Sequence, residues 1–176
     1  MSRIVMIGGH GKVALLAAPL LVDAGHEVVS LIRNPDHSAD VAATGATPLV
    51  LSVEEADVAE LTRVFAGADA IVWSAGAGGK GGPERTDAVD RAAAIRSMEA
   101  AAAAGVRRYV MVSFLTAYGE VPDDHPLRAY AIAKIAADRH LQTTDLDWTI
   151  LGPGLLTLDE PTGAITVARV LKGTPS

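Results

Sequence analysis

The sequence predicts an α/β protein with a mostly parallel, doubly wound sheet that is covered by helices on both faces. Three observations lead to this fold class. Short apolar runs alternate with helical segments from residue 3 onward, glycines follow the first run directly, and no linker or internal repeat interrupts the alternation. The chain has 176 residues, of which 49% are hydrophobic, and is long enough to bury a substantial core. We expect one domain over residues 1–176.

The first half of the chain contains three apolar runs of strand length, at residues 3–7, 27–33 and 47–51. The segments that follow these runs are expected to be helices, at residues 12–24, 36–44 and 54–67. The first helix ends before Gly25 and the second before Gly45, because glycine readily adopts the left-handed backbone that follows a helix. The third helix starts with two acidic residues, which are stabilised at the positive end of a helix.

The second half continues the same alternation. Further strands are expected at residues 70–75, 108–114 and 148–152. Helices are expected at residues 84–104 and from Pro126, which suits a first helical turn, to residue 141. The glycine-rich segment 76–85 and the polar segment 115–125 are expected to be loops after the fourth and fifth strands. Six alternations of strand and helix predict a Rossmann fold.

Composition argues against several kinds of partner. The chain has 15 basic and 21 acidic residues, a net charge of −6 and no basic run, so we expect no nucleic-acid or anionic-membrane surface. The longest apolar run, residues 13–22, is too short to span a bilayer, and the first residues lack the pattern of a signal peptide. The absence of cysteine excludes a disulfide framework and a thiolate nucleophile. We therefore expect a cytoplasmic protein, and the sequence leaves its oligomeric state open.

The segment MIGGHGKVA places Gly8, Gly11 and Ala14 at the junction between the first strand and the first helix. A tight turn there needs a residue without Cβ, the close approach of a diphosphate needs a second, and helix packing on the strand needs a small third residue. The free N–H groups at the helix start would then bind phosphate. A P-loop fits less well, because the glycine and the Ser or Thr that accompany its lysine are missing. The sequence predicts a dinucleotide as the ligand.

The end of the second strand usually distinguishes the two nicotinamide cofactors. An acid there accepts hydrogen bonds from the ribose hydroxyls of NAD(H), whereas a cation binds the additional phosphate of NADP(H). The strand ends in Arg33, with Asn34 and Pro35 following and no acid at that point. We therefore favour NADP(H) over NAD(H), the alternative being an exposed arginine that only ends a strand.

The segment RAYAIAKIAADRHL, residues 128–141, sets Tyr130 and Lys134 one helical turn apart on the same face. The spacing alone is weak, but it follows a fifth strand that ends in Ser113, in a chain that opens with a dinucleotide-type turn. Tyr130 and Lys134 are therefore candidates for an acid/base and ribose-binding pair.

Together, these segments resemble the atypical short-chain dehydrogenase/reductase family, in its NAD(P)-binding, NmrA-like branch of small flavin- and biliverdin-reductase-type proteins. The resemblance covers roughly residues 3–154. It depends on the segments IGGHGKVA, IRNP, VWSAGAG, VRRYVMVSF, YAIAK and DWTILGPG. Relatives usually continue beyond the equivalent of residue 176 with a further strand and helix that complete the sheet.

The resemblance implies a role for individual positions. The catalytic residues would be Ser113, which polarises the substrate carbonyl, Tyr130 and Lys134. Ser52 stands where many members carry an acid near the adenine, and Gly152 stands where many carry an arginine. The implied cofactor contacts are Gly8, His10, Gly11, Lys12, Val13, Arg33, Ser52, Ser74, Ala75, Gly76, Lys134 and Pro153.

The implied chemistry is hydride transfer to a small organic acceptor. Hydride delivery to a carbonyl leaves an oxyanion, which Tyr130 would protonate, with the Lys134 cation lowering the pKa of the phenol. Tyr118 is a weaker alternative donor. A quinone, flavin or tetrapyrrole acceptor needs mainly orientation, which makes the tyrosine dispensable.

Two other functions stay open, a non-catalytic NADP(H)-binding redox sensor and an NAD(P)-dependent epimerase or isomerase. The five histidines include no pair at helical i, i+4 spacing, so no metal site is expected. Asp90 and Arg91 are expected on a solvated face of the fourth helix, and His37 at the surface.

Overall fold

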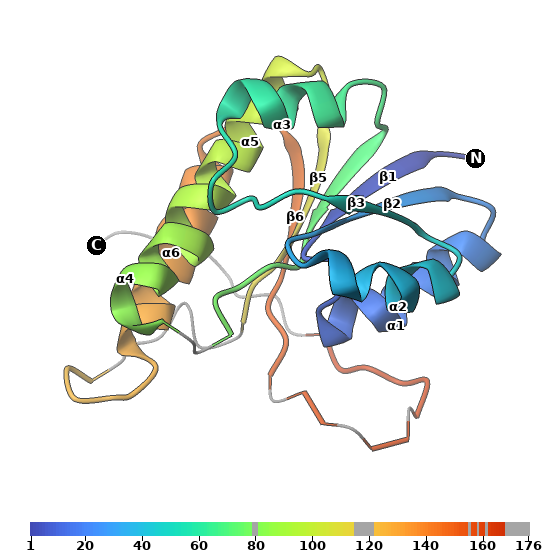
Figure 1. Cartoon of the computed structure of the whole chain (residues 1–176). Helices are drawn as coiled ribbons and strands as arrows, with labels where there is room; N and C mark the ends of the chain where they lie inside the picture. The colour runs from blue at the N-terminus through green and yellow to red at the C-terminus, as the bar shows by residue number, and fades with distance from the viewer. Residues whose placement is uncertain (79–80, 115–121, 155, 158, 161, 168–176) are drawn as a thin grey trace.

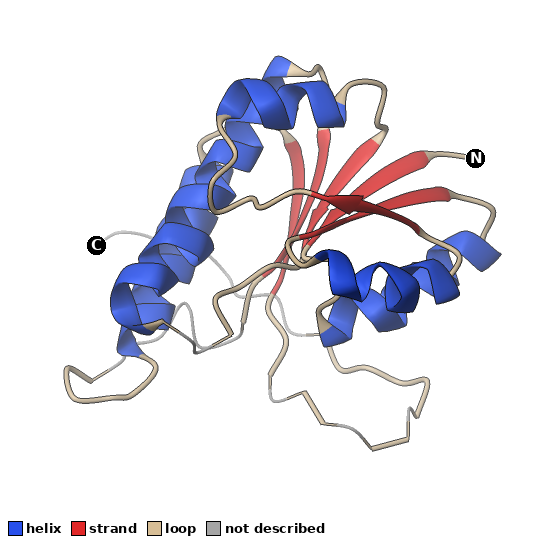
Figure 2. Ribbon diagram, in the orientation of Figure 1, coloured by secondary structure: helices blue, strands red, loops and turns tan. Residues whose placement is uncertain are grey.

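Six parallel strands form one sheet that lies between two groups of helices, as Figure 1 and Figure 2 show. The computed structural model describes residues 1–78, 81–114, 122–154, 156–157, 159–160 and 162–167. Every neighbouring pair of strands is parallel, in the order β3-β2-β1-β4-β5-β6. The strands are β1 (Arg3–Ile7), β2 (Glu27–Ile32), β3 (Thr47–Val50), β4 (Ala70–Trp73), β5 (Arg108–Val112) and β6 (Asp147–Leu151). The predicted doubly wound fold is confirmed.

Helices cover both faces of the sheet, with α1 and α2 on one side and α3, α5 and α6 on the other (Figure 1). Their bounds are α1 (Lys12–Asp23), the 3₁₀ turn η1 (Pro35–His37), α2 (Ser38–Ala43), α3 (Val58–Phe65), α4 (Gly82–Thr86), the π-helical segment η2 (Asp87–Ala93), α5 (Ala94–Ala103) and α6 (Arg128–Gln142). Two separate clusters of buried residues form the core, a small one under α1 and α2 and a large one under the other three helices.

Two helices begin later than the sequence predicts. The third, α3, starts at Val58 instead of residue 54, because the Asp57 side chain accepts a hydrogen bond from the Glu60 N–H at 2.7 Å and caps the helix. The last, α6, starts at Arg128, and Pro126 lies in the turn that precedes it. The predicted helix 84–104 is present as α4, η2 and α5 in direct succession.

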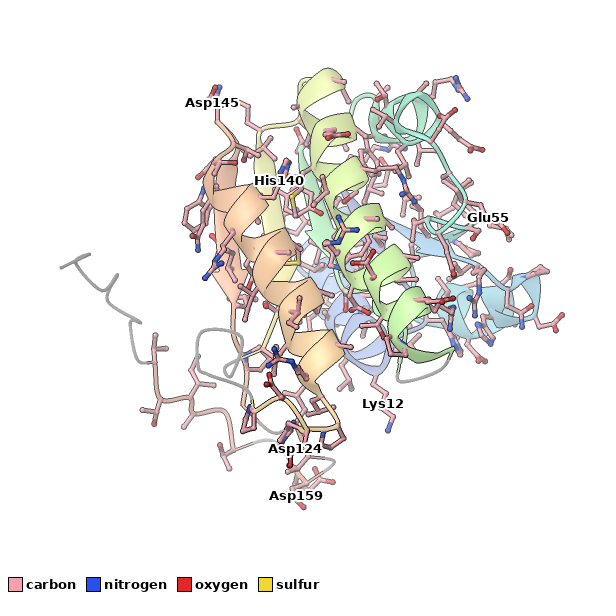
Figure 3. The ribbon with its side chains drawn as sticks, turned by 90° about the vertical axis from the view of Figure 1, so that its left-hand side faces the viewer. Lys12, Glu55, Asp124, His140, Asp145 and Asp159 are labelled. Atoms are coloured by element: carbon pink, nitrogen blue, oxygen red, sulfur yellow. The ribbon has the colours of Figure 1, made fainter. Side chains whose placement is uncertain are left out.

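The order of the strands places a crevice at the centre of the sheet. From β1 the chain proceeds to one edge through β2 and β3, and from β4 it proceeds to the other edge through β5 and β6. Ligands of such sheets bind at this switch point, outside the carboxyl ends of the strands. In Figure 3, Lys12 at the start of α1 and Asp124 before α6 lie at this end, and Asp145 before β6 lies at the opposite end.

Within the described residues, no helix is long and apolar enough to cross a membrane.

Candidate active site

Two adjoining cavities follow the carboxyl edge of the sheet. The first, of about 410 Å³, lies over the ends of β1, β2 and β3, and the second, of about 600 Å³, lies between α1, β5 and α6. Both are lined by Gly11, by the segment Ser74–Gly76 after β4, and by Gly78. The predicted site residues divide between the two cavities. The first is lined by Gly8, His10, Arg33 and Ser52, and the second by Lys12, Val13, Ser113, Tyr130, Lys134 and Pro153.

The first two positions of the turn after β1, Gly8 and Gly9, have no room for a side chain. Gly8 has φ +80°, and a Cβ there would lie 2.6 Å from the Ala75 Cα. Gly9, which the sequence argument did not single out, has no space either, because its Cβ would lie 2.4 Å from the Ser30 Cβ. The doubled glycine in MIGGHG was the signal for this position.

The third glycine of the turn opens the start of α1. The Gly11 N–H donates to the Gly8 carbonyl at 2.9 Å, and Gly11 occupies the N-cap of α1, where it has no side chain that could accept from the first N–H groups. The first turn of α1 also carries no acidic residue. These N–H groups therefore remain available for an anion, and the turn fits a diphosphate.

An acidic residue from another segment reaches Arg33 in the first cavity, although the sequence has no acid at the end of the second strand itself. Glu54, from the segment after β3, lies 3.3 Å from Arg33 and 3.2 Å from Arg85 of α4. Tertiary structure alone brings these three residues together, because they are separated by 21 and 31 residues along the chain.

Two stacked histidines belong to the lining of the same cavity. The rings of His10 and His37 have their centroids 3.6 Å apart, and the His10 Nε2 lies 2.9 Å from the Asp40 Oδ2. His37 was expected only at the surface, yet it lines the cavity together with His10.

A buried charged cluster supports the second cavity. Lys134 is 2% exposed, and its Nζ donates to the Val112 carbonyl at 3.1 Å and lies 3.7 Å from the Asp90 Oδ1. Asp138, one turn further along α6, accepts from the Ser113 hydroxyl at 2.6 Å and is fully buried, as is Asp90. The cluster thus places two carboxyl groups beside one ammonium group in the protein interior.

Asp90 is the link between this cluster and the loop after β4. Its Oδ2 accepts from the Ala77 N–H at 3.0 Å, and its Oδ1 lies 3.0 Å from the position that a Cβ on Gly76 would take. Asp90 was expected on a solvated helix face, but only Arg91 is there, paired with Asp87 at 2.6 Å. Burial raises the pKa of Asp90, and the bond from Ala77 and the Lys134 charge oppose that rise without cancelling it.

Tyr130 and Lys134 lie on the same face of α6, as predicted, but the lysine does not lower the pKa of the phenol. The Lys134 Nζ lies 5.8 Å from the centroid of the Tyr130 ring. Burial, with further contributions from the Asp90 and Asp138 charges, raises the pKa of Tyr130 to about 12. Burial also lowers the pKa of Lys134. The pKa shift of Tyr130 is opposite to the expected one, chiefly because the phenol is partly buried and secondly because two buried acids lie near it.

Ser113 also differs from expectation. It lies at the edge of the second cavity, but it donates its hydroxyl proton to Asp138 instead of holding it for a substrate carbonyl. Only the lone pairs of Ser113 remain for a ligand. Tyr118, the alternative proton donor, lies outside the described residues. Among the residues that the structure describes, no group of three or more His, Cys, Asp or Glu could hold a metal ion.

Comparison with known proteins agrees with this geometry. Residues 8–175 match the family described as NAD(P)H-binding. The chain belongs to this family. The NAD(P)H-binding match includes the glycine turn, both cavities and the whole of the buried cluster.

The individual relatives have names that describe epimerases or oxidoreductases. The chain is 32% identical to the uncharacterized sugar epimerase YhfK of Bacillus subtilis, over 97% of this chain and 79% of that protein. A solved structure from Bacillus halodurans, provisionally assigned as an NAD-dependent epimerase/dehydratase, has a TM-score of 0.88 at 33% identity, covering 96% of this chain and 77% of the other. The oxidoreductase ylbE of Lactococcus lactis has a TM-score of 0.77 at 28% identity, covering 92% and 73%. The resemblance to short-chain dehydrogenases and reductases is confirmed.

Proposed function

We propose that this NAD(P)H-binding protein is a reductase that uses NADP(H) to reduce a small organic acceptor of the carbonyl, quinone or flavin type. The observation that carries the proposal is the continuity of the two cavities over Gly11 and Ser74–Gly76. A dinucleotide with its diphosphate on the glycine turn has an adenosine site on one side and a nicotinamide site on the other. The bound cofactor supplies the hydride.

Tyr130 supplies the proton in this proposal. A pKa of about 12 keeps the phenol protonated throughout the neutral range, which suits an acid that must protonate an oxyanion formed when the acceptor gains a hydride. The phenolate left after transfer is close to the buried Lys134, whose Nζ lies 5.8 Å from the centroid of the Tyr130 ring. Ser113 accepts a hydrogen bond from the resulting hydroxyl, because its own proton is donated to Asp138.

The same pKa favours reduction over epimerisation. An epimerase or a dehydratase begins by removing a proton from an alcohol or a carbon acid, which needs a base that is ionised before the reaction starts. The names of the Bacillus relatives favour the epimerase as the second candidate. The two candidates differ in outcome, since an epimerase returns its cofactor unchanged, whereas a reductase consumes one NADPH for each acceptor.

Removal of the Tyr130 hydroxyl tests the catalytic assignment. We expect Tyr130→Phe to lower the rate of carbonyl reduction by about 10²- to 10⁴-fold, the usual contribution of a positioned proton donor, while NADPH binding stays within about twofold. The measurement is the transfer of deuterium from the reduced nicotinamide of labelled NADPH to a panel of aldehydes, ketones and quinones. Unchanged carbonyl reduction would exclude Tyr130 as the donor, and firm NADPH binding without transfer to any acceptor would support a sensor instead.

Cofactor preference is tested at Arg33. We expect Arg33→Ala to weaken the binding of NADPH by about tenfold or more and that of NADH by less than about threefold, because only NADPH carries the phosphate that an arginine binds. Isothermal titration with each cofactor measures both values. Equal losses for the two cofactors would show that Arg33 does not contact the phosphate.

A further inference from the structure

One carboxylate lies between the two arginines at the adenosine end of the first cavity. The Glu54 Oε2 lies 3.3 Å from the Arg33 Nη1 and 3.2 Å from the Arg85 Nε, and Oε1 lies 3.3 Å from the same Arg85 nitrogen. All three side chains line the cavity. A ligand that enters this end therefore meets one negative and two positive groups.

Hydrogen bonds from Arg96 hold the backbone around Glu54 in place. The guanidinium of Arg96, on α5, donates to the carbonyls of Val53 and Glu54 at 3.0 Å and to that of Ala56 at 3.2 Å. Three hydrogen bonds from the half-buried Arg96 therefore hold the turn after β3. The backbone of Glu54 is consequently fixed, and its carboxylate belongs to the lining of the cavity.

The two arginines differ in their freedom to move. The Arg33 side chain is 60% exposed, whereas those of Glu54 and Arg85 are 27% and 23% exposed. Arg85 also donates to the Ala77 carbonyl at 3.4 Å and packs against Gly81. Arg33 can therefore follow a ligand, while Glu54 and Arg85 stay where the fold holds them.

We propose that Glu54 is the residue that determines how strongly this protein discriminates between NADPH and NADH. The inference rests on the proposed cofactor site. The Glu54 carboxylate accepts a hydrogen bond from the 2′-hydroxyl of an unphosphorylated adenosine ribose, and it repels a 2′-phosphate at the same position. Arg33 and Arg85 offset that repulsion, so both cofactors bind and the preference for NADPH is limited.

The size of the effect follows from charge. The Glu54 carboxylate and a 2′-phosphate are like charges and repel each other, and part of this repulsion is screened by the two arginines and by salt. We expect the repulsion that is left to change the ratio of the NADPH and NADH dissociation constants by about tenfold. Glu54 therefore acts against Arg33 with an effect of similar size.

The test compares cofactor affinities of full-length variants by isothermal titration. We expect Glu54→Gln to tighten the binding of NADPH and weaken that of NADH, so that the ratio of the two dissociation constants shifts by about tenfold or more toward NADPH. Glu54→Ser, which removes the charge with a smaller side chain, should shift the ratio in the same direction. Denaturation curves show which variants are folded.

Glu55 supplies a matched control. It is the neighbouring acid, exposed, and Figure 3 shows it at the surface of the molecule. Glu55→Gln removes the same charge from the chain and should leave the ratio within about twofold of the wild-type value. An equal shift in both Gln variants would show that only net charge matters and would overturn the inference.

The inference and the proposed function fail in different ways. If the wild-type protein binds NADPH but neither Glu54 variant changes the ratio, Glu54 does not contact the ribose and the inference is wrong. If the wild-type protein binds neither cofactor, the proposed cofactor site itself is wrong.

Discussion

Gly8→Ala should abolish dinucleotide binding and lower the free energy of unfolding by on the order of 3 kcal/mol. A left-handed backbone costs an L-residue about 1–2 kcal/mol, and the new Cβ would also lie 2.6 Å from the Ala75 Cα. A contact with backbone cannot be relieved by rotating a side chain, so β1 and the loop after β4 must separate. That separation displaces Ala75, which lines both cavities. Urea denaturation and titration with NADPH measure the two effects.

Gly25→Ala is the matched control for the backbone conformation. Gly25 has φ +85°, close to the +80° of Gly8, but no atom lies within 4 Å of its Cβ position. We expect this variant to lose only about 1 kcal/mol of stability and to bind NADPH as the wild-type protein does. If Gly8→Ala retained wild-type affinity for NADPH, the diphosphate would not bind at the turn after β1.

Lys134→Met should destabilise the protein by about 3–5 kcal/mol, the usual cost of leaving buried charge without its partner. The variant keeps a side chain of similar length but leaves the buried Asp90 and Asp138 without the ammonium group that interacts with both. Arg91→Met, which breaks the exposed pair with Asp87, should cost less than about 0.5 kcal/mol. Urea denaturation of both variants at neutral pH measures the difference.

The loss in Lys134→Met should depend on pH. Burial raises the pKa of Asp90 in the folded protein. An acid with a raised folded pKa favours folding at pH values below its unfolded pKa, and that contribution is lost as pH rises through the folded value. Removing the lysine raises this pKa further, so the deficit relative to wild type should shrink as the pH falls and the buried carboxyl groups become protonated. A deficit that grew on acidification would mean that the buried carboxyl groups are not its cause.

The buried cluster also connects the loop after β4 to helix α6. Asp90 holds the loop after β4 through the Ala77 N–H and faces Lys134 on α6. The π-helical segment η2 carries Asp90 into this position. Such segments occur often at functional sites, because they rotate a side chain relative to the regular α-helical pattern. The loop after β4 and helix α6 are thereby connected through the Asp90 side chain.

Sequence patterns were sufficient for the features that depend on neighbouring residues. Apolar runs predicted all six strands, and the glycine spacing predicted the turn at Gly8 and Gly11, because each feature is determined by local backbone sterics and by burial of a short segment. The placement of Tyr130 and Lys134 on one face follows equally from the helical repeat. Helix starts were less accurate, since capping by Asp57 competes with the helix propensity of the residues before it.

The electrostatic environment of the site depended on contacts between distant segments. Three features of the site depend on residues from different elements. They are the raised pKa of Tyr130, the hydrogen bond from Ser113 to Asp138, and the position of Glu54 between two arginines. No local pattern encodes such contacts, because burial and charge partners exist only after the helices pack on the sheet. The sequence by itself determined the fold and the dinucleotide turn through local sterics and hydrophobic periodicity, and tertiary packing alone decided which charges face the ligand.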